Sequence, residues 1–193
     1  MFDQIKANID KKISLTEEEF QRFSSFLKFK KLRKKQHLLF EGDKCEFTGF
    51  VNSGCLRTYF LDSHAKEHII NFSFEDWWVG DLYSLLTGNP AIYAIEALED
   101  TEVLLMGKDD LETIYDTIPK FERFFRILTQ NAYIAFQRRV MDNFSQTAEE
   151  NYQALLKKFP FIAQRVPQYQ IAAYLGITPE SLSRIRKDLA HKH

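Results

Sequence analysis

Short apolar runs and turn-forming residues alternate through the first half of the chain. Between Phe29 and about Val103, the runs recur roughly every ten residues and are rich in aromatic and branched side chains, which is typical of an all-β barrel or sandwich. Two of these runs, Phe50-Val51 and Leu56–Phe60, are separated by Asn52-Ser53-Gly54, and we expect them to be the strands of one hairpin. After about Asp109, apolar residues are instead three and four positions apart, which indicates helices.

Capping residues and prolines predict where the helices begin and end. Thr16 and Glu19 have the spacing of a capping box at the start of a short N-terminal helix. Residues 109–144 predict a helix that breaks or bends near Pro119. Three shorter helices are expected at 147–159, 167–175 and 179–190, with prolines between them.

The helix after Pro119 carries two neighbouring apolar stripes. Steps of four and three residues define a heptad seam of Phe121, Phe125, Leu128, Ala132 and Ala135. A second stripe consists of Phe124, Ile127, Ile134 and Met141. We therefore expect one stripe to pack on the chain's own barrel and the seam to contact a second copy in a homodimer. A single broad face packed on the core is the alternative.

Residues 168–187 match a helix-turn-helix at each position where sterics are strict. Ala172 lies where two helices approach closely, Gly176 lies in the turn, where glycine adopts a positive φ at little cost, and Thr178 is a natural N-cap. The expected core of the motif is Ile171, Leu175, Ile177, Leu182 and Ile185. Its second helix presents side chains suited to a DNA groove, expected to be Thr178, Glu180, Ser181, Ser183, Arg184 and Lys187. A helical hairpin with a solvated charged face is the alternative.

Taken together with this helix-turn-helix, the whole chain resembles the cyclic-AMP receptor protein/FNR family of transcription factors. Phe40-Glu41-Gly42-Asp43 and Val51-Asn52-Ser53-Gly54 resemble the turns of its β-roll, and Gly80-Asp81-Leu82 resembles its phosphate-cassette motif. The resemblance implies an α+β fold. An N-terminal β-roll (jelly-roll, cyclic-nucleotide-binding-like) would be the sensor at 1–117, followed by a dimerisation helix at 118–145 and a helix-turn-helix DNA-binding domain at 146–193.

The sequence departs from this family at the effector pocket. Cyclic-nucleotide-binding relatives carry an Arg-Ser pair where this chain has Ala91-Ile92, and no Lys or Arg lies between Gly80 and Glu102. A phosphate buried without a cation is costly. In these relatives, hydroxyl groups on the long helix contact the adenine. The equivalent positions in this chain fall near Ala135 and Phe136, which have no hydroxyl group. We therefore expect a pocket of Gly80, Asp81, Leu82, Ala91, Ile92, Ala135 and Phe136 that does not bind cyclic AMP in the usual way.

Few residues are candidates for a cofactor. Iron–sulfur sensing needs about four cysteine ligands, and Cys45 and Cys55 alone exclude it within one subunit. The number of histidines does not exclude a haem cofactor, because His37, His64 and His68 are present. Histidines in hairpins are, however, more often solvated or packed in the core. We expect no metal site, and an effector that is an unidentified small molecule or absent.

Charge becomes informative when it is divided along the chain. The net charge is −1, but residues 138–193 hold nine Lys or Arg and five Asp or Glu, a net charge of +4, whereas the remaining residues carry −5. A basic segment on an acidic body fits local contact with double-stranded DNA. No run approaches the roughly 20 apolar residues of a membrane span, and the N-terminus lacks the apolar centre of a signal peptide, so we expect a cytoplasmic protein without membrane contact.

Three functions remain to be compared. The first is a DNA-binding transcription regulator, for which the resemblance adds RNA polymerase as a partner. The second is a cyclic-nucleotide-like ligand-binding module that acts through protein partners and retains a vestigial DNA-binding hairpin. An enzyme on a cupin-like barrel ranks last, because the five histidines lack the required clustering. Family members continue into a β-hairpin wing after the recognition helix, whereas this sequence ends at His193, either without a wing or truncated.

Overall fold

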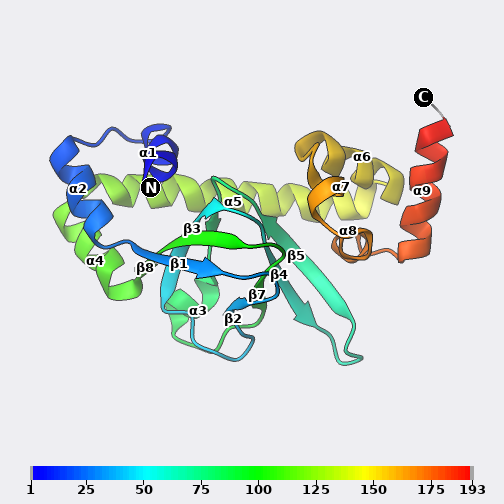
Figure 1. Ribbon diagram of the computed structural model, residues 1–193, viewed down its shortest axis with the longest axis horizontal. Helices are drawn as coiled ribbons and strands as arrows, with labels where there is room; N and C mark the ends of the chain where they lie inside the picture. The colour runs from blue at the N-terminus through cyan, green and yellow to red at the C-terminus, as the bar shows by residue number, and fades with distance from the viewer. Residues whose placement is uncertain (1, 192–193) are drawn as a thin grey trace. The chain divides into compact units, whose positions relative to one another are not determined.

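The computed structural model describes residues 2–191, which divide into two compact units. The first unit comprises residues 2–60 and 71–131, and the second comprises residues 61–70 and 132–191. Figure 1 traces the chain through both units. In the part of the chain that is described, no helix is both long and apolar enough to cross a membrane.

Within residues 2–191, eight strands form two four-stranded sheets. One sheet has the order β1-β8-β3-β6 and consists of Lys28–Leu32, Thr101–Gly107, Phe47–Ser53 and Trp78–Val79. The other has the order β2-β7-β4-β5 and consists of His37–Leu39, Ala94–Ala97, Leu56–Leu61 and Glu67–Ser73. The predicted β-roll is therefore present, and it includes a short helix, α3 (Leu82–Thr87), that the apolar pattern did not predict.

The first sheet separates two apolar clusters, because successive side chains of a strand point to opposite faces. Val51 and Val103 point into the interior of the roll, where they meet Leu32, Leu39, Leu56 and Ile95. Phe50, Leu104 and Met106 point to the other face, which is covered by α1 (Asp3–Asp10), α2 (Glu17–Ser25), α4 (Lys108–Thr117) and the first part of α5 (Lys120–Ser145). Phe20, Phe23, Phe121 and Phe124 are buried in this helical layer.

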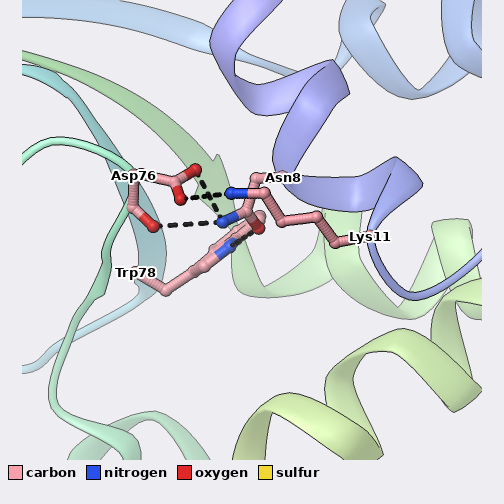
Figure 2. A network of polar contacts seen from close by, with 4 residues as sticks. All are labelled: Asn8, Lys11, Asp76 and Trp78. Carbon is pink, nitrogen blue, oxygen red and sulfur yellow. Dashed lines mark hydrogen bonds and ion pairs between the residues drawn. The ribbon is translucent and has the colours of Figure 1, made fainter.

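A polar network attaches α1 to the loop before β6 (Figure 2). Asn8 donates to the Asp76 backbone carbonyl at 3.0 Å and to Asp76 Oδ1 at 2.9 Å, while Lys11 Nζ lies 2.6 Å from Asp76 Oδ2. The Trp78 indole N–H donates to Asn8 Oδ1 at 3.0 Å. The Trp78 ring also packs edge-on against Phe124 of α5. The network thus links α1 to the start of the long helix.

The expected hairpin between Phe50-Val51 and Leu56–Phe60 is wrong. Strands β3 and β4 belong to different sheets, and β3 pairs with β8 and β6 instead. The chain crosses between the sheets at Gly54, which has φ +93°, and a Cβ at this position would lie 2.4 Å from Thr101 Oγ1. The Thr101 hydroxyl accepts the Cys55 N–H at 3.2 Å, which anchors the crossing.

The helix boundaries agree well with the local sequence signals. Thr16 and Glu19 form the predicted capping box of α2, and the long helical segment is interrupted at Ile118 and Pro119. The three predicted C-terminal helices are α6 (Ala148–Lys158), α8 (Gln168–Leu175) and α9 (Pro179–His191), and a one-turn helix α7 (Ile162–Arg165) lies between the first two.

Candidate nucleic-acid interface and sensor site

Helices α8 and α9 are joined by a tight turn at Gly176. This glycine has φ +70° and caps α8, with its N–H directed to the Ala173 carbonyl at 3.3 Å. The Ile177 N–H donates to the Ala172 carbonyl at 3.0 Å. These bonds satisfy carbonyls that the end of a helix leaves without partners, and the left-handed conformation favours glycine.

Small and branched side chains fix α8 against α9. Ala172 and Leu182 have no exposed surface, and Ile171 is also buried, whereas Leu175, Ile177 and Ile185 are only partly covered. The Thr178 hydroxyl accepts the Ser181 N–H at 3.2 Å, so Thr178 caps α9 as the sequence predicts. The crossing angle therefore depends on the small volume of Ala172.

One face of α9 carries exposed polar side chains. Glu180, Ser183, Arg184 and Lys187 are all exposed. Because these positions recur at intervals of three and four residues, they lie on the same side of the helix. A helix of this kind fits the major groove, where Arg pairs with guanine and a carboxylate accepts from cytosine.

Ser181 lies at the margin of this face. It is only partly exposed, its hydroxyl accepts from the Thr178 hydroxyl at 3.1 Å, and the Arg184 guanidinium lies within 3.4 Å of the same oxygen. Ser181 is thus occupied within the helix, and its hydrogen bond directs Arg184.

Glu180 keeps its charge through local hydrogen bonds. Its own backbone N–H and then the Thr178 hydroxyl lower the pKa of the Glu180 carboxyl below the ordinary value. An ionised carboxylate in the first turn of a helix also interacts favourably with the helix dipole. Glu180 is therefore available as a hydrogen-bond acceptor at neutral pH.

In the roll, the segment of residues 80–92, called here the cassette, encloses its own carboxyl group. Asp81 is fully buried and caps α3, accepting the Ser84 N–H at 3.0 Å and the Ile92 N–H at 3.3 Å. Burial, followed by the negative charge of Asp81 and a hydrogen bond to it, raises the pKa of Tyr93. No Lys or Arg occurs in the cassette sequence to offset this charge.

The cassette residues named by the sequence do not all face inward. Ala91 is buried in the apolar interior together with Cys45 and Val79. The side chains of Leu82 and Ile92 are instead 47% and 57% exposed, so they point out of the roll. Gly80 approaches the Phe47 carbonyl so closely that a Cβ would lie 3.2 Å from it. Ala135 and Phe136, expected opposite the cassette, belong to the second unit and are exposed there.

The long helix uses part of the predicted seam for its own core. Phe121 is fully buried and stacks on Phe23 at 4.5 Å between ring centroids, which corrects the prediction that it contacts a second copy. Phe125 and Leu128 are half-buried against the same cluster, whereas Ala132 and Ala135 are exposed. A heptad count cannot distinguish the two kinds of contact, because a core face and a dimer face have the same spacing.

Further along α5, a different set of apolar side chains is exposed. This set, called here the distal stripe, consists of Tyr133, Ile134, Phe136, Val140, Met141 and Phe144, with exposed fractions from 36% to 87%. Ile134 and Met141 belong to the second stripe of the sequence. The positions lie on one broad face, and such a patch marks an interaction surface.

Comparison with known proteins agrees with this architecture. Residues 29–117 match the family model of the cyclic nucleotide-binding domain. The transcriptional activator protein Anr of Pseudomonas protegens is 25% identical over 185 residues, which cover 90% of this chain and 75% of that protein. The anaerobic regulatory protein of Pasteurella multocida is 24% identical over 184 residues, covering 89% of this chain and 67% of that protein.

Among solved structures, FixK2 from Bradyrhizobium japonicum superimposes with a TM-score of 0.74 at 24% identity, covering 86% of this chain and 85% of that one. Over most of its length the chain is similar to regulators of the cyclic-AMP receptor protein/FNR family. The predicted α+β class, with a β-roll followed by a long helix and a helix-turn-helix, is confirmed.

Two sets of side-chain contacts in the structure could not be predicted from the sequence. Arg57 and Glu96 form a buried ion pair across β4 and β7, with Arg57 Nη2 2.6 Å from Glu96 Oε2. Their register could not be read from the sequence, because the partner strands are far apart in the chain. Arg139 of α5 is the second: within the described residues, its guanidinium contacts backbone carbonyls and a tyrosine ring, which no residue pattern encodes.

Both cysteines and two of the histidines make side-chain contacts within the chain. Cys45 and Cys55 are buried free thiols. His68 lies 2.8 Å from Asp62, and His37 lies 3.0 Å from the Tyr59 hydroxyl. Among residues 2–191, no group of three or more His, Cys, Asp or Glu side chains is placed to hold a metal ion.

Proposed function

We propose that the chain is a cytoplasmic transcription regulator that binds double-stranded DNA as a homodimer and has no enzymatic activity. The observation that carries the proposal is the geometry of α8 and α9, where a buried Ala172 and a left-handed Gly176 hold a second helix with an exposed polar face. The relatives are described as a transcriptional activator and as regulatory proteins, which supports the same role. RNA polymerase is a further partner under this proposal.

Each helix-turn-helix would read one half-site. Arg184 would contact guanine and Glu180 cytosine, with Ser183 beside them, while Lys187 would contact a phosphate. Thr178 and Ser181 cap and direct α9, so their contribution to base contacts would be secondary. The positive charge of residues 138–193 would add attraction for DNA of any sequence.

Sensing, dimerisation and DNA binding would be carried out by consecutive parts of the chain. Residues 1–117 would form the sensor roll, 118–145 the dimerisation helix, and 146–193 the DNA-binding domain. The distal stripe of α5 supports dimerisation, because it leaves six large apolar side chains uncovered in a single chain. Phe125, Leu128, Ala132 and Ala135 would border this contact.

The sensor would not take cyclic AMP in the usual way. A cyclic phosphate placed in the cassette would meet the buried Asp81 carboxyl and Ala91 rather than a cation. The Asp81 oxygens already accept the backbone donors of Ser84 and Ile92. The effector would be another small molecule that reaches Gly80, Leu82 or Ile92 in the cassette, or there would be none.

Selection of duplexes from a random library by the purified protein tests the function. Enrichment of a two-fold symmetric motif with two half-sites supports the proposal, since a symmetric dimer binds a symmetric site. Weak binding of all duplexes alike, or no binding, would favour the second candidate, a ligand-binding module that acts through proteins.

A further inference from the structure

Arg139 connects three segments of the second unit. It projects from α5, and its guanidinium donates to the carbonyls of Ile70 and Ile69, the latter at 3.3 Å. It also donates to the Tyr174 carbonyl of α8 at 3.3 Å, and its Cζ lies 4.1 Å from the centroid of the Tyr174 ring. We call these four contacts the Arg139 clasp.

The clasp joins α5 to backbone carbonyls of β5 and α8 and to the Tyr174 ring. Tyr174 lies in the last turn of α8, at the end of the helix that carries the negative pole of the helix dipole. Ile69 and Ile70 belong to β5, the edge strand of its sheet. A cation at these carbonyls is therefore favourable without any carboxylate partner.

The chemistry of the clasp requires arginine. A planar guanidinium has five N–H donors in a fixed fork and can stack on an aromatic ring, whereas an ammonium group cannot do both. Arg139 is also partly buried, unlike its neighbour Arg138. Burial, followed by the charge of Arg139, lowers the pKa of Lys158 at the end of α6.

We propose that Arg139 is a positioning residue that fixes the helix-turn-helix on α5 and thereby determines the half-site spacing that the protein accepts. Because Ala172 and Leu182 lock α9 to α8, an orientation imposed on α8 is passed to the recognition helix. In a dimer joined through α5, that orientation sets the distance between the two recognition helices, which must match DNA half-sites about 34–36 Å apart. The inference rests on the proposed function.

The first test varies the spacing of the DNA. Starting from a duplex that the wild-type protein selects, the spacer is lengthened and shortened by one and by two base pairs, and a single half-site duplex is included. Arg139→Met should weaken binding at the preferred spacing by about tenfold, which corresponds to ~1.4 kcal/mol, and flatten the spacing profile. Affinity for the single half-site should change by less than about twofold, the range of a negligible free-energy difference.

Two further variants separate charge from geometry. Arg138→Met removes the same charge one residue away and should keep the wild-type profile. Arg139→Lys keeps the charge without the fork and should resemble Arg139→Met. A wild-type profile in Arg139→Met would overturn the proposal, and so would an equal loss at the half-site, because that would mean Arg139 stabilises the motif rather than positioning it.

A second measurement needs no DNA and therefore separates this inference from the proposed function. Backbone amide exchange of the intact protein should accelerate about tenfold at residues 61–70 and 172–177 in Arg139→Met, but not in Arg138→Met. The reason is that these two segments open locally more often once the contacts of Arg139 are lost. Unchanged exchange in both segments refutes the clasp even if DNA binds. Faster exchange in a protein that selects no DNA would support the clasp and refute the regulator function.

Discussion

Removing the Asp81 carboxyl tests the account of the closed cassette. Asp81→Ala deletes the acceptor of two backbone donors, Ser84 N–H at 3.0 Å and Ile92 N–H at 3.3 Å, and the partner of the Tyr93 hydroxyl. Asp81 is fully buried, so water cannot replace these bonds without local opening. The cassette should therefore lose much of its rigidity.

The expected magnitude follows from these bonds. Loss of an N-cap side chain costs about 1 kcal/mol, and each buried donor left unsatisfied costs about 1–3 kcal/mol. Relief from burying a carboxyl group offsets part of this cost. We therefore expect the free energy of unfolding to fall by about 2–4 kcal/mol, the range of these combined effects.

Urea unfolding followed by tryptophan fluorescence is a suitable assay, because Trp77 and Trp78 both lie in the first unit. Asp116→Ala is a matched control, since Asp116 is exposed on α4 of the same unit, and it should change stability by less than about 0.5 kcal/mol. A similarly small effect for Asp81→Ala would refute the reasoning that this carboxyl holds the cassette together.

Three further predictions use other parts of the chain. Calorimetry with cyclic AMP should show no binding in the micromolar range, and a micromolar dissociation constant would contradict the role given to Asp81 and Ala91. Asn8→Ala should lower the free energy of unfolding by about 1–3 kcal/mol, because it strips the Trp78 indole N–H of its acceptor (Figure 2), and an unchanged urea midpoint would argue against this network. Phe144→Asp should yield monomers in sedimentation experiments while Asn131→Asp stays dimeric; a dimer in both would remove the distal stripe from the interface.

Local chemistry made the helix boundaries predictable from the sequence. The Thr16 cap, the break at Pro119 and the Gly176 turn each depend on residues within one or two turns of one another. The same is true of the helix-turn-helix, whose turn depends on a small residue at 172, a glycine at 176 and a cap at 178. These positions could therefore be assigned without knowing the rest of the molecule.

Contacts between segments far apart in the chain could not be predicted from the sequence. The apolar runs around Phe50 and Leu56 look like a hairpin, and only the close approach of Gly54 to Thr101 explains why the chain changes sheets. Phe121 has the spacing of a dimer contact but stacks on Phe23, nearly a hundred residues earlier in the chain. Spacing along one helix contains no information about which partner covers it.

In the candidate site, too, some features could be predicted from the sequence and others could not. The residue types on α9 follow from the sequence, and their roles at DNA remain predictions. The hydrogen bonds that Asp81 accepts from Ser84 and Ile92 show that the cassette carboxyl has partners within the chain, which the missing arginine alone could not show. The Arg139 clasp involves backbone carbonyls, so only the structure could reveal it.

Comparison of Arg184→Ala with Lys187→Ala on a selected-site library at two salt concentrations tests the central claim most directly. Arg184→Ala should cost about 1–3 kcal/mol at the specific site and relax the preference at one base pair per half-site, as expected for a base contact. Lys187→Ala should weaken binding to all sequences alike and reduce the salt dependence, as expected for a phosphate contact. If Arg184→Ala lowers affinity evenly across sequences, its assignment as a base reader is wrong. If neither variant changes DNA binding, the helix-turn-helix does not read DNA and the proposed function is contradicted.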